Sequence, residues 1–191
     1  MSAMLSEREF RRKAFHLLFG TLILLLIYYT GITTSFIFVG ICTILGIMLS
    51  FAIVHGYKIP FFKKMAEESE RIEERKFPGK AAVYFFVSAL IIMFIFRDNP
   101  TLVLAAISVQ VYADTAAALI GIKYGEHKLF RRKTWEGSIA CLIVAAICIN
   151  LFYPLQIALI AAIAATIIEL LPMDDNMWVP LISAVTIRLL L

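Results

Sequence analysis

Cysteine is scarce in this sequence. The 191 residues include only three, Cys42, Cys141 and Cys148, and no two of them form a CxxC pair. All three lie inside apolar runs, where an unpaired cysteine behaves as a small core residue. Neither a structural disulfide nor a zinc site is expected from this usage.

The common nucleotide-binding signatures are also missing. No segment matches the GxxxxGK[ST] phosphate loop, and the motifs of protein kinases are absent. There is no internal repeat and no low-complexity tract. Nucleic acid is a poor partner for this chain, because its basic residues belong to short loops between apolar runs.

Apolar residues are abundant instead. They make up 61% of the chain, with a mean hydropathy of +0.87, whereas soluble domains are usually about half apolar. Lipid offers no partner for backbone N–H and C=O groups, so each apolar run must be helical. We expect an all-α fold: a polytopic transmembrane helix bundle of about seven spans, forming a single integral membrane domain over residues 1–191. The runs are 14–29, 34–54, 81–96, 101–122, 139–153, 155–171 and 177–191. Several are shorter than the roughly 20 residues of a perpendicular span, so they would extend into polar flanks or thin the bilayer.

The basic residues predict the orientation of this bundle. Of the 18 lysines and arginines, all but Arg97 and Arg188 precede the first run or lie in the loops 56–80 and 123–137. The positive-inside rule therefore places the N-terminus and both loops in the cytoplasm. The first run lacks an A-x-A cleavage pattern, so we expect it to be retained as a helix. Residues 61–76 fit a short interfacial helix or a solvated charged hairpin equally well.

Two acids, Asp114 and Glu169, are embedded in apolar runs. An ionised acid in such a place is costly and normally faces a polar cavity, a metal or a partner. The predicted topology puts both near the cytoplasmic ends of their runs. Simpler alternatives stay open: Asp114 could pair with a nearby lysine, and Glu169 could bridge two helices.

Other polar residues are predicted at the same depth. His16 and Lys80 lie near the inner ends of the first and third runs, and Asp174, Asp175 and Asn176 form the next inner loop. His16 could equally be an interface histidine, and the two aspartates could only solvate a turn. The shared depth of these residues favours a site on the cytoplasmic face.

A basic cluster, residues 128–133, leads into the fifth apolar run. Thr134, Glu136, Gly137 and Ser138 follow it. Free N–H groups at a helix N-terminus favour anions, so this segment could hold a triphosphate, while the acids opposite could hold Mg²⁺. The basic residues could also serve only as topology charges or as a lipid-headgroup anchor. Gly121 and Gly125 form a small-xxx-small pair that could serve helix packing alone. His55 and His127 receive no role.

Three segments resemble a known family. The block "DTAAALIGIKYGEHKLFRRKTWEGSIA" is similar to the signature of the CTP-dependent lipid-alcohol kinases, which include dolichol or polyprenol kinase, phytol kinase and the CTP-using diacylglycerol kinase. "RRKAFHLLFG" and "IELLPMDDNMWVPL" resemble the opening and closing segments of that group. The block also resembles the phosphatidate cytidylyltransferases, but it lacks their Ser-Pro before the Lys-Thr pair and their Gly-Gly after it. Ala113 stands where the family usually has glycine.

The resemblance implies a CTP-dependent kinase that phosphorylates the terminal hydroxyl of a membrane isoprenoid alcohol, with Mg²⁺ as cofactor. It implies Asp114 and Glu169 as catalytic residues, and His16 as a contact to the lipid hydroxyl or phosphate. The implied metal ligands are Asp114, Asp174 and Asp175. The implied nucleotide-binding residues are Lys80, Lys128, Arg132, Lys133, Thr134, Glu136, Gly137, Ser138 and Asn176.

Two alternatives remain at this point. One is a phosphatidate-type cytidylyltransferase that makes a CDP-lipid. The other, from a different class, is a small proton-coupled transporter that uses Asp114 and Glu169. The expected partners are CTP, a membrane lipid alcohol and the bilayer. The sequence leaves open which alcohol is used and whether the chain forms a homo-oligomer.

Overall fold

The computed structural model describes residues 2–57, 77–130 and 133–191, with side chains from residue 7 onward. Helices dominate it, and every predicted apolar run falls on helix, which confirms the all-α expectation. A short antiparallel ribbon, β1 with β2, was not predicted. The predicted element at 61–76 and residue Arg132 lie outside the described residues.

The elements are α1 (Ser2–Val54), α3 (Lys80–Ile95), α4 (Pro100–Ser108), η2 (Val109–Ala113), α5 (Asp114–Tyr124), β1 (Lys128–Phe130), β2 (Lys133–Thr134), α6 (Trp135–Asn150), α7 (Leu155–Leu170) and α8 (Asp175–Leu189).

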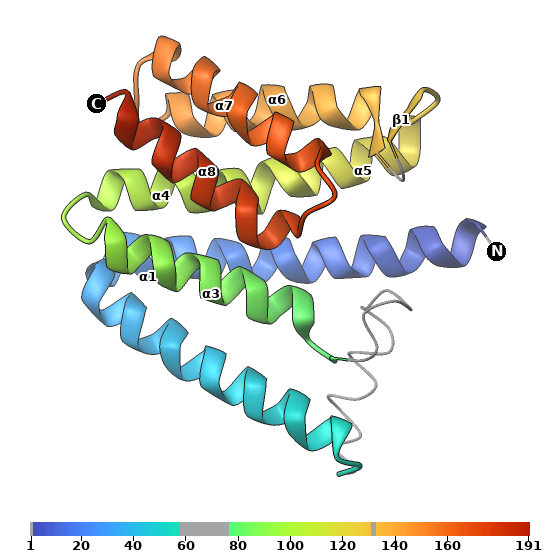
Figure 1. Cartoon of the computed structure of the whole chain (residues 1–191), viewed down its shortest axis with the longest axis vertical. Helices are drawn as coiled ribbons and strands as arrows, with labels where there is room; N and C mark the ends of the chain where they lie inside the picture. Colours follow the sequence, from blue (N-terminus) through green and yellow to red (C-terminus); the bar gives the residue numbers. More distant parts are fainter. Residues whose placement is uncertain (1, 58–76, 131–132) are drawn as a thin grey trace.

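Helix α1 is broken at Gly31. Its backbone has φ 80° and ψ 171° there, a conformation that glycine adopts without the penalty a side chain would bring. The break separates the first two predicted runs into two arms that diverge in Figure 1. Helix α3 contacts both arms: Phe85 packs against His16, and Phe94 packs against Phe36.

The centre of the molecule is the helical rod formed by α4, η2 and α5. Asn99 caps its start by accepting a hydrogen bond from the Leu102 amide at 3.0 Å, and Pro100 occupies the first turn. The rod passes through a π-helical turn, η2, directly before Asp114. In Figure 1, α6 and α7 lie on one side of the rod and α1 and α3 on the other, while α8 crosses it.

The outer surface is strongly apolar. Large side chains such as Leu18, Phe38, Ile44, Ile143 and Leu159 are exposed, each by 44% or more. Such a surface is unusual in a soluble protein. Two helical stretches, Glu7–Val54 and Pro100–Tyr124, are long and apolar enough to cross a membrane, and three further apolar helices are shorter. These features indicate a membrane protein, whereas seven crossings and a cytoplasmic N-terminus stay predictions.

Two of the three cysteines lie where they were expected. Cys141 and Cys148 are buried in the helix core, Cys42 is half-buried, and all three are free. The expectation of small core residues is therefore confirmed for Cys141 and Cys148, but not for Cys42.

Candidate active site

The buried acid Asp114 has a lysine partner. Its side chain is paired with the ammonium group of Lys13, and the two residues are only 4% and 2% exposed. The ring nitrogen Nε2 of His16 lies 3.7 Å from the same carboxylate oxygen. The lysine contact considered for Asp114 is thus present, while a catalytic role for Asp114 stays a prediction. The lysine lies 101 residues away in the sequence, among the basic residues that predict the orientation of the bundle.

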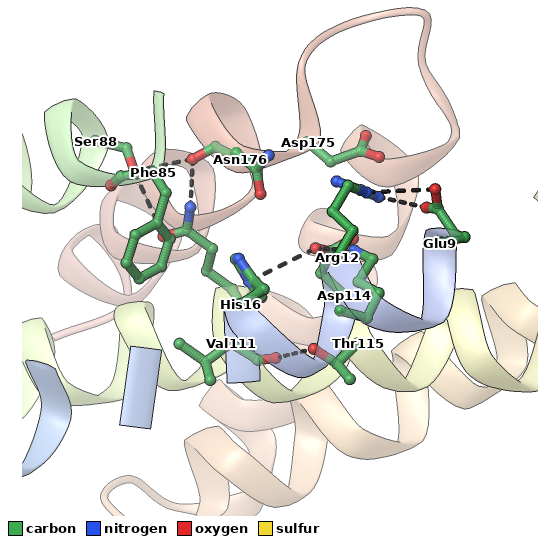
Figure 2. A network of polar contacts seen from close by, with 12 residues as sticks. Glu9, Arg12, His16, Phe85, Ser88, Val111, Asp114, Thr115, Asp175 and Asn176 are labelled. Atoms are coloured by element: carbon green, nitrogen blue, oxygen red, sulfur yellow. Dashed lines mark hydrogen bonds and ion pairs between the residues drawn. The ribbon is translucent and has the colours of Figure 1, made fainter. Parts of the chain in front are cut away.

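A buried polar network adjoins this pair (Figure 2). The side-chain amide of Gln110 donates to the carbonyl oxygen of Asn176, and the Ser88 hydroxyl donates to the same oxygen at 2.9 Å. His16 Nε2 lies 3.0 Å from the carbonyl oxygen of Gln110, to which it donates when it carries its proton. The network ties α1, α3, η2 and α8 together beside Asp114. π-Helical turns occur frequently at functional sites, and η2 brings Gln110 into this position.

A second cluster forms where β2 meets the ends of α7 and α8. The ammonium group of Lys133 donates to Asp175 at 2.8 Å and to the buried carboxylate of Glu169. Lys80, at the start of α3, pairs with Asp174 at 2.8 Å. The structure therefore brings together acids and lysines that the sequence places on different loops and helices.

These charges perturb one another. Burial by itself lowers the pKa of the Lys133 ammonium, but the negative charges of Asp175, Glu169 and Asp114 outweigh burial and raise that pKa above its ordinary value. Burial raises the pKa of Asp175 to about 6, against the opposing attraction of Lys133, and the charges of Asp114 and Glu169 add to the increase. Asp114 therefore acts electrostatically on both members of the Lys133–Asp175 pair.

A small cavity of about 110 Å³ joins the two clusters. Its lining residues are Arg12, Lys13, Asp114, Met173, Asp174, Asp175 and Asn176. Two buried oxygens in this region have no hydrogen-bond partner, namely Oδ1 of Asn176 and Oε2 of Glu169. Buried polar atoms are normally satisfied, so these two atoms are candidates for ligand contacts.

The start of α6 depends on close packing against α5. Thr134 caps α6 by accepting a hydrogen bond from the Gly137 amide at 3.2 Å. A Cβ atom at Gly137 would lie only 2.8 Å from the Ala117 carbonyl oxygen, and one at Gly125 would lie 2.6 Å from Thr134. The packing role considered for Gly121 and Gly125 is confirmed and extends to Gly137. A nucleotide contact for Gly137 stays a prediction.

The remaining candidates, like Lys80, Lys133 and Glu169, lie outside the lining of the cavity. Lys128 is exposed on β1. Glu136 pairs with the Nδ1 nitrogen of His127 at 2.6 Å, and this hydrogen bond holds the pKa of Glu136 below its usual range. The Ser138 hydroxyl is buried without a partner. His127, to which no role was assigned, thus organises the ribbon end of α6.

The described residues do not form a ready-made cage of ligands for the predicted metal ion. Among the described residues, no three His, Cys, Asp or Glu side chains form a group suited to hold a metal ion. Mg²⁺ usually binds through one or two carboxylates together with substrate phosphates and water, so it does not require such a cage. Mg²⁺ remains a prediction here.

Sequence reasoning missed Lys13, Arg12, Ser88 and Gln110. Lys13 and His16 are three residues apart and share a helix face, which was an available signal. Gln110 stands four residues before Asp114 in an apolar run, and this spacing was a second signal.

Comparison with known proteins now identifies the family. Residues 1–186 match the cytidylyltransferase family, so the chain belongs to it. An uncharacterized protein of Methanocaldococcus jannaschii is 32% identical over 187 residues, covering 95% of this chain and 93% of that protein. A probable chloroplastic phytol kinase of Triticum aestivum is 29% identical over 150 residues, covering 67% of this chain and 48% of the kinase. No solved structure matched the chain.

Proposed function

We propose that this protein is a CTP-dependent kinase that phosphorylates the terminal hydroxyl of an isoprenoid alcohol, such as a polyprenol or dolichol, at the cytoplasmic face of a membrane. The observation that carries the proposal is the meeting of Asp114 and Asp175 on one cavity, with Lys133, from a third part of the chain, bound to Asp175 beside it. Membership of a family named for CTP chemistry and likeness to a probable phytol kinase support it.

The proposed reaction has simple bond changes. The hydroxyl oxygen of the lipid forms a bond to the γ-phosphorus, the bond from that phosphorus to the β–γ bridging oxygen breaks, and CDP leaves. The hydroxyl proton passes to Asp114, whose carboxylate is held in place by Lys13 and lies near His16. Phosphoryl transfer depends on positioning and charge neutralisation more than on covalent participation by the protein.

The basic side chains would receive the phosphates. Lys133 and Lys80 each hold a carboxylate at the cavity, and each is partly exposed, by 27% and 34% of its side chain. An ammonium group that is both anchored and accessible suits a phosphate contact. Thr134, Glu136 and Ser138 would line the adjoining part of the nucleotide site at the start of α6.

The cavity lining fits Mg²⁺ in its usual mode of binding. The carboxylate of Asp174 or Asp175 and the unpartnered oxygen of Asn176 would hold the ion together with phosphate oxygens and water. When bound, Mg²⁺ would neutralise triphosphate charge during transfer.

The test uses γ-labelled CTP, Mg²⁺ and a panel of lipid alcohols with the purified protein. The proposal expects label in a lipid monophosphate, and it expects CTP to serve better than ATP. Absence of labelled lipid across polyprenols, dolichol and phytol would reject it.

The cytidylyltransferase alternative has one observation in its favour, the name of the family that matches residues 1–186. It expects a CMP-bearing lipid and release of pyrophosphate. α-Labelled CTP separates the two reactions, because only the cytidylyltransferase transfers that label to lipid. The transporter alternative rests on Asp114 and Glu169 alone and is not carried further.

A further inference from the structure

One carbonyl oxygen near the start of α8 lacks the donor that a helix normally supplies. The carbonyl oxygen of each residue in an α-helix accepts from the amide four residues further on, and the residue four beyond Asn176 is Pro180. Proline has no N–H group, so the Asn176 carbonyl lacks this hydrogen bond. Asn176 is only 5% exposed, and a buried carbonyl without a donor is costly. Another element must therefore supply the donor.

Gln110 supplies it. Its side-chain amide donates to the Asn176 carbonyl oxygen, although Gln110 is 0% exposed and lies in the central rod. The Ser88 hydroxyl lies 2.9 Å from the same oxygen and 2.8 Å from the Phe85 carbonyl oxygen (Figure 2). A hydroxyl has a single proton to donate, so Ser88 satisfies only one of these carbonyls at a time. Gln110 is thus the donor committed to Asn176.

The start of α8 depends on this contact. The side chain of Asp174, which precedes α8, accepts no hydrogen bond from the described amides of the first turn and pairs with Lys80 instead. Pro180 removes one of the backbone hydrogen bonds that join the first turn to the rest of the helix. Helices bend most readily at such a proline. The hydrogen bond from Gln110 holds the first turn of α8 against η2.

The same turn forms one edge of the cavity. Asp175 and Asn176 line the cavity from α8, and Asp114 lines it from α5. Gln110 stands four residues before Asp114 on the same rod, so its hydrogen bond to α8 relates the two edges to each other. With any other residue in place of Pro180, α8 would satisfy its own carbonyl and would not need the glutamine. The π-helical turn and the proline turn of α8 therefore meet beside the cavity.

We propose that Gln110 is a positioning residue. It holds the carbonyl oxygen that Pro180 leaves without a backbone donor, and it thereby fixes the first turn of α8 across the cavity from Asp114. The inference rests on the proposed function for its effect on turnover. The hold on α8 itself depends on no substrate and no reaction.

Hydrogen–deuterium exchange of the purified full chain in detergent tests this hold without any substrate. Gln110→Met keeps the length of the side chain and removes the donor. It should speed exchange in the segment 171–182 by about 5-fold, the equivalent of one hydrogen bond, while α6 keeps its rates. Unchanged exchange in the segment 171–182 would overturn the inference.

Pro180→Ala tests the reason for the hold. This variant restores an N–H group at residue 180, so α8 can satisfy its own carbonyl oxygen. In the Pro180→Ala background, Gln110→Met should speed exchange in the segment 171–182 by less than about 2-fold, because the two changes are coupled through one oxygen atom. An equal effect of Gln110→Met in both backgrounds would show that its amide acts elsewhere and would reject the proposal.

Gln156→Met is the matched control. Gln156 is the only other glutamine of the chain, and it is exposed near the start of α7. The same substitution there should leave both exchange in the segment 171–182 and turnover unchanged. Gln110→Asn, whose amide ends one methylene short of the Asn176 carbonyl, gives the same test where Gln110→Met does not yield folded protein.

Turnover separates positioning from simple stability. Gln110→Met should lower kcat for label transfer from γ-labelled CTP by about 10- to 100-fold, as a small misplacement of reacting groups does. The KM for CTP should change less, because Lys80 and Lys133 are untouched. Pro180→Ala should restore part of the lost kcat. A folded Gln110→Met protein with the kcat of the unchanged chain would show that the glutamine is merely structural and would overturn the proposal.

The outcome is separable from that of the proposed function. A protein whose exchange follows these expectations but which transfers no γ-label to any lipid alcohol keeps the hold of Gln110 on α8 and loses the kinase. A protein that labels lipid, while Gln110→Met changes neither exchange nor kcat, keeps the kinase and loses this inference.

Discussion

The two lysine–acid clusters differ in how far they are sealed from solvent. In the Lys13–Asp114 pair the side chains are 2% and 6% exposed, whereas in the Lys133–Asp175 pair they are 27% and 22% exposed. Within the described part of the chain, Lys13 pairs with one carboxylate, while Lys133 pairs with two. Similar ion pairs can therefore serve different purposes in one protein. The sealed pair is suited to hold Asp114 in place, and the accessible one is suited to exchange partners with a ligand.

The largest effect is expected at the sealed pair. Asp114→Asn leaves the Lys13 charge buried without a partner, so the protein should lose about 3–5 kcal/mol of stability. Lys13→Met should lose a similar amount, and the double variant should regain most of it. Turnover should fall by at least about 100-fold in the two variants that lack the Asp114 carboxylate, if Asp114 accepts the hydroxyl proton.

Thermal unfolding in detergent and γ-label transfer measure these two effects separately. Normal turnover in the stable double variant would remove Asp114 from the chemistry. Equal instability of the double and single variants would show that the two charges do not act as a pair.

The accessible pair should respond differently. Lys133→Met should raise the KM for CTP by about 10- to 100-fold, the equivalent of a lost hydrogen bond between charged groups. Its unfolding temperature should fall no more than that of Lys13→Met, because each change leaves one buried carboxylate without its lysine, Glu169 or Asp114, while solvent reaches Asp175. Steady-state kinetics and thermal unfolding check both parts, and a larger stability loss at Lys133 than at Lys13 would reverse the comparison.

The helix contact beside the accessible pair gives a smaller and purely structural effect. Gly137→Ala would place a Cβ atom 2.8 Å from the Ala117 carbonyl oxygen, so α5 and α6 must move apart at a cost of about 1–3 kcal/mol. Gly40→Ala is the control, since its Cβ would meet nothing closer than Leu90 at 4.0 Å. Thermal unfolding measures the loss of stability in the two variants. An equal loss would mean that α5 and α6 have room for a methyl group between them.

The network beside the sealed pair should give the smallest loss of stability. Gln110→Met removes the donor to the Asn176 carbonyl oxygen, but Ser88 still donates to that oxygen. We expect a cost of about 1 kcal/mol, typical of one hydrogen bond. Thermal unfolding measures it, and a loss as large as that of Lys13→Met would place Gln110 among the essential contacts of the fold.

The sequence predicted the helical fold and several residues that the structure brings together in the candidate site. Long apolar runs require helices, and they were correctly predicted even where Gly31 joins two runs with hardly any loop. Asp114 and Glu169 were identified as candidates because an ionised carboxylate in an apolar run is energetically costly and normally faces a polar cavity, a metal or a partner. Lys13 was missed because a lysine at the inner end of a run also serves topology, and only tertiary structure reveals that it reaches Asp114. Gln110, η2 and the β1–β2 ribbon depend on packing between distant segments, which local sequence patterns do not encode.

The π-helical turn before Asp114 holds one residue more than an α-helical turn. Deleting a single residue between 109 and 113 would convert the turn to ordinary α-helix, and the helix beyond it would keep nearly the same orientation, because the wider turn absorbs the additional residue. Asp114 would still face Lys13. The side chains inside the turn would change direction instead, so Gln110 would lose its hydrogen bond to Asn176 while the buried ion pair remained.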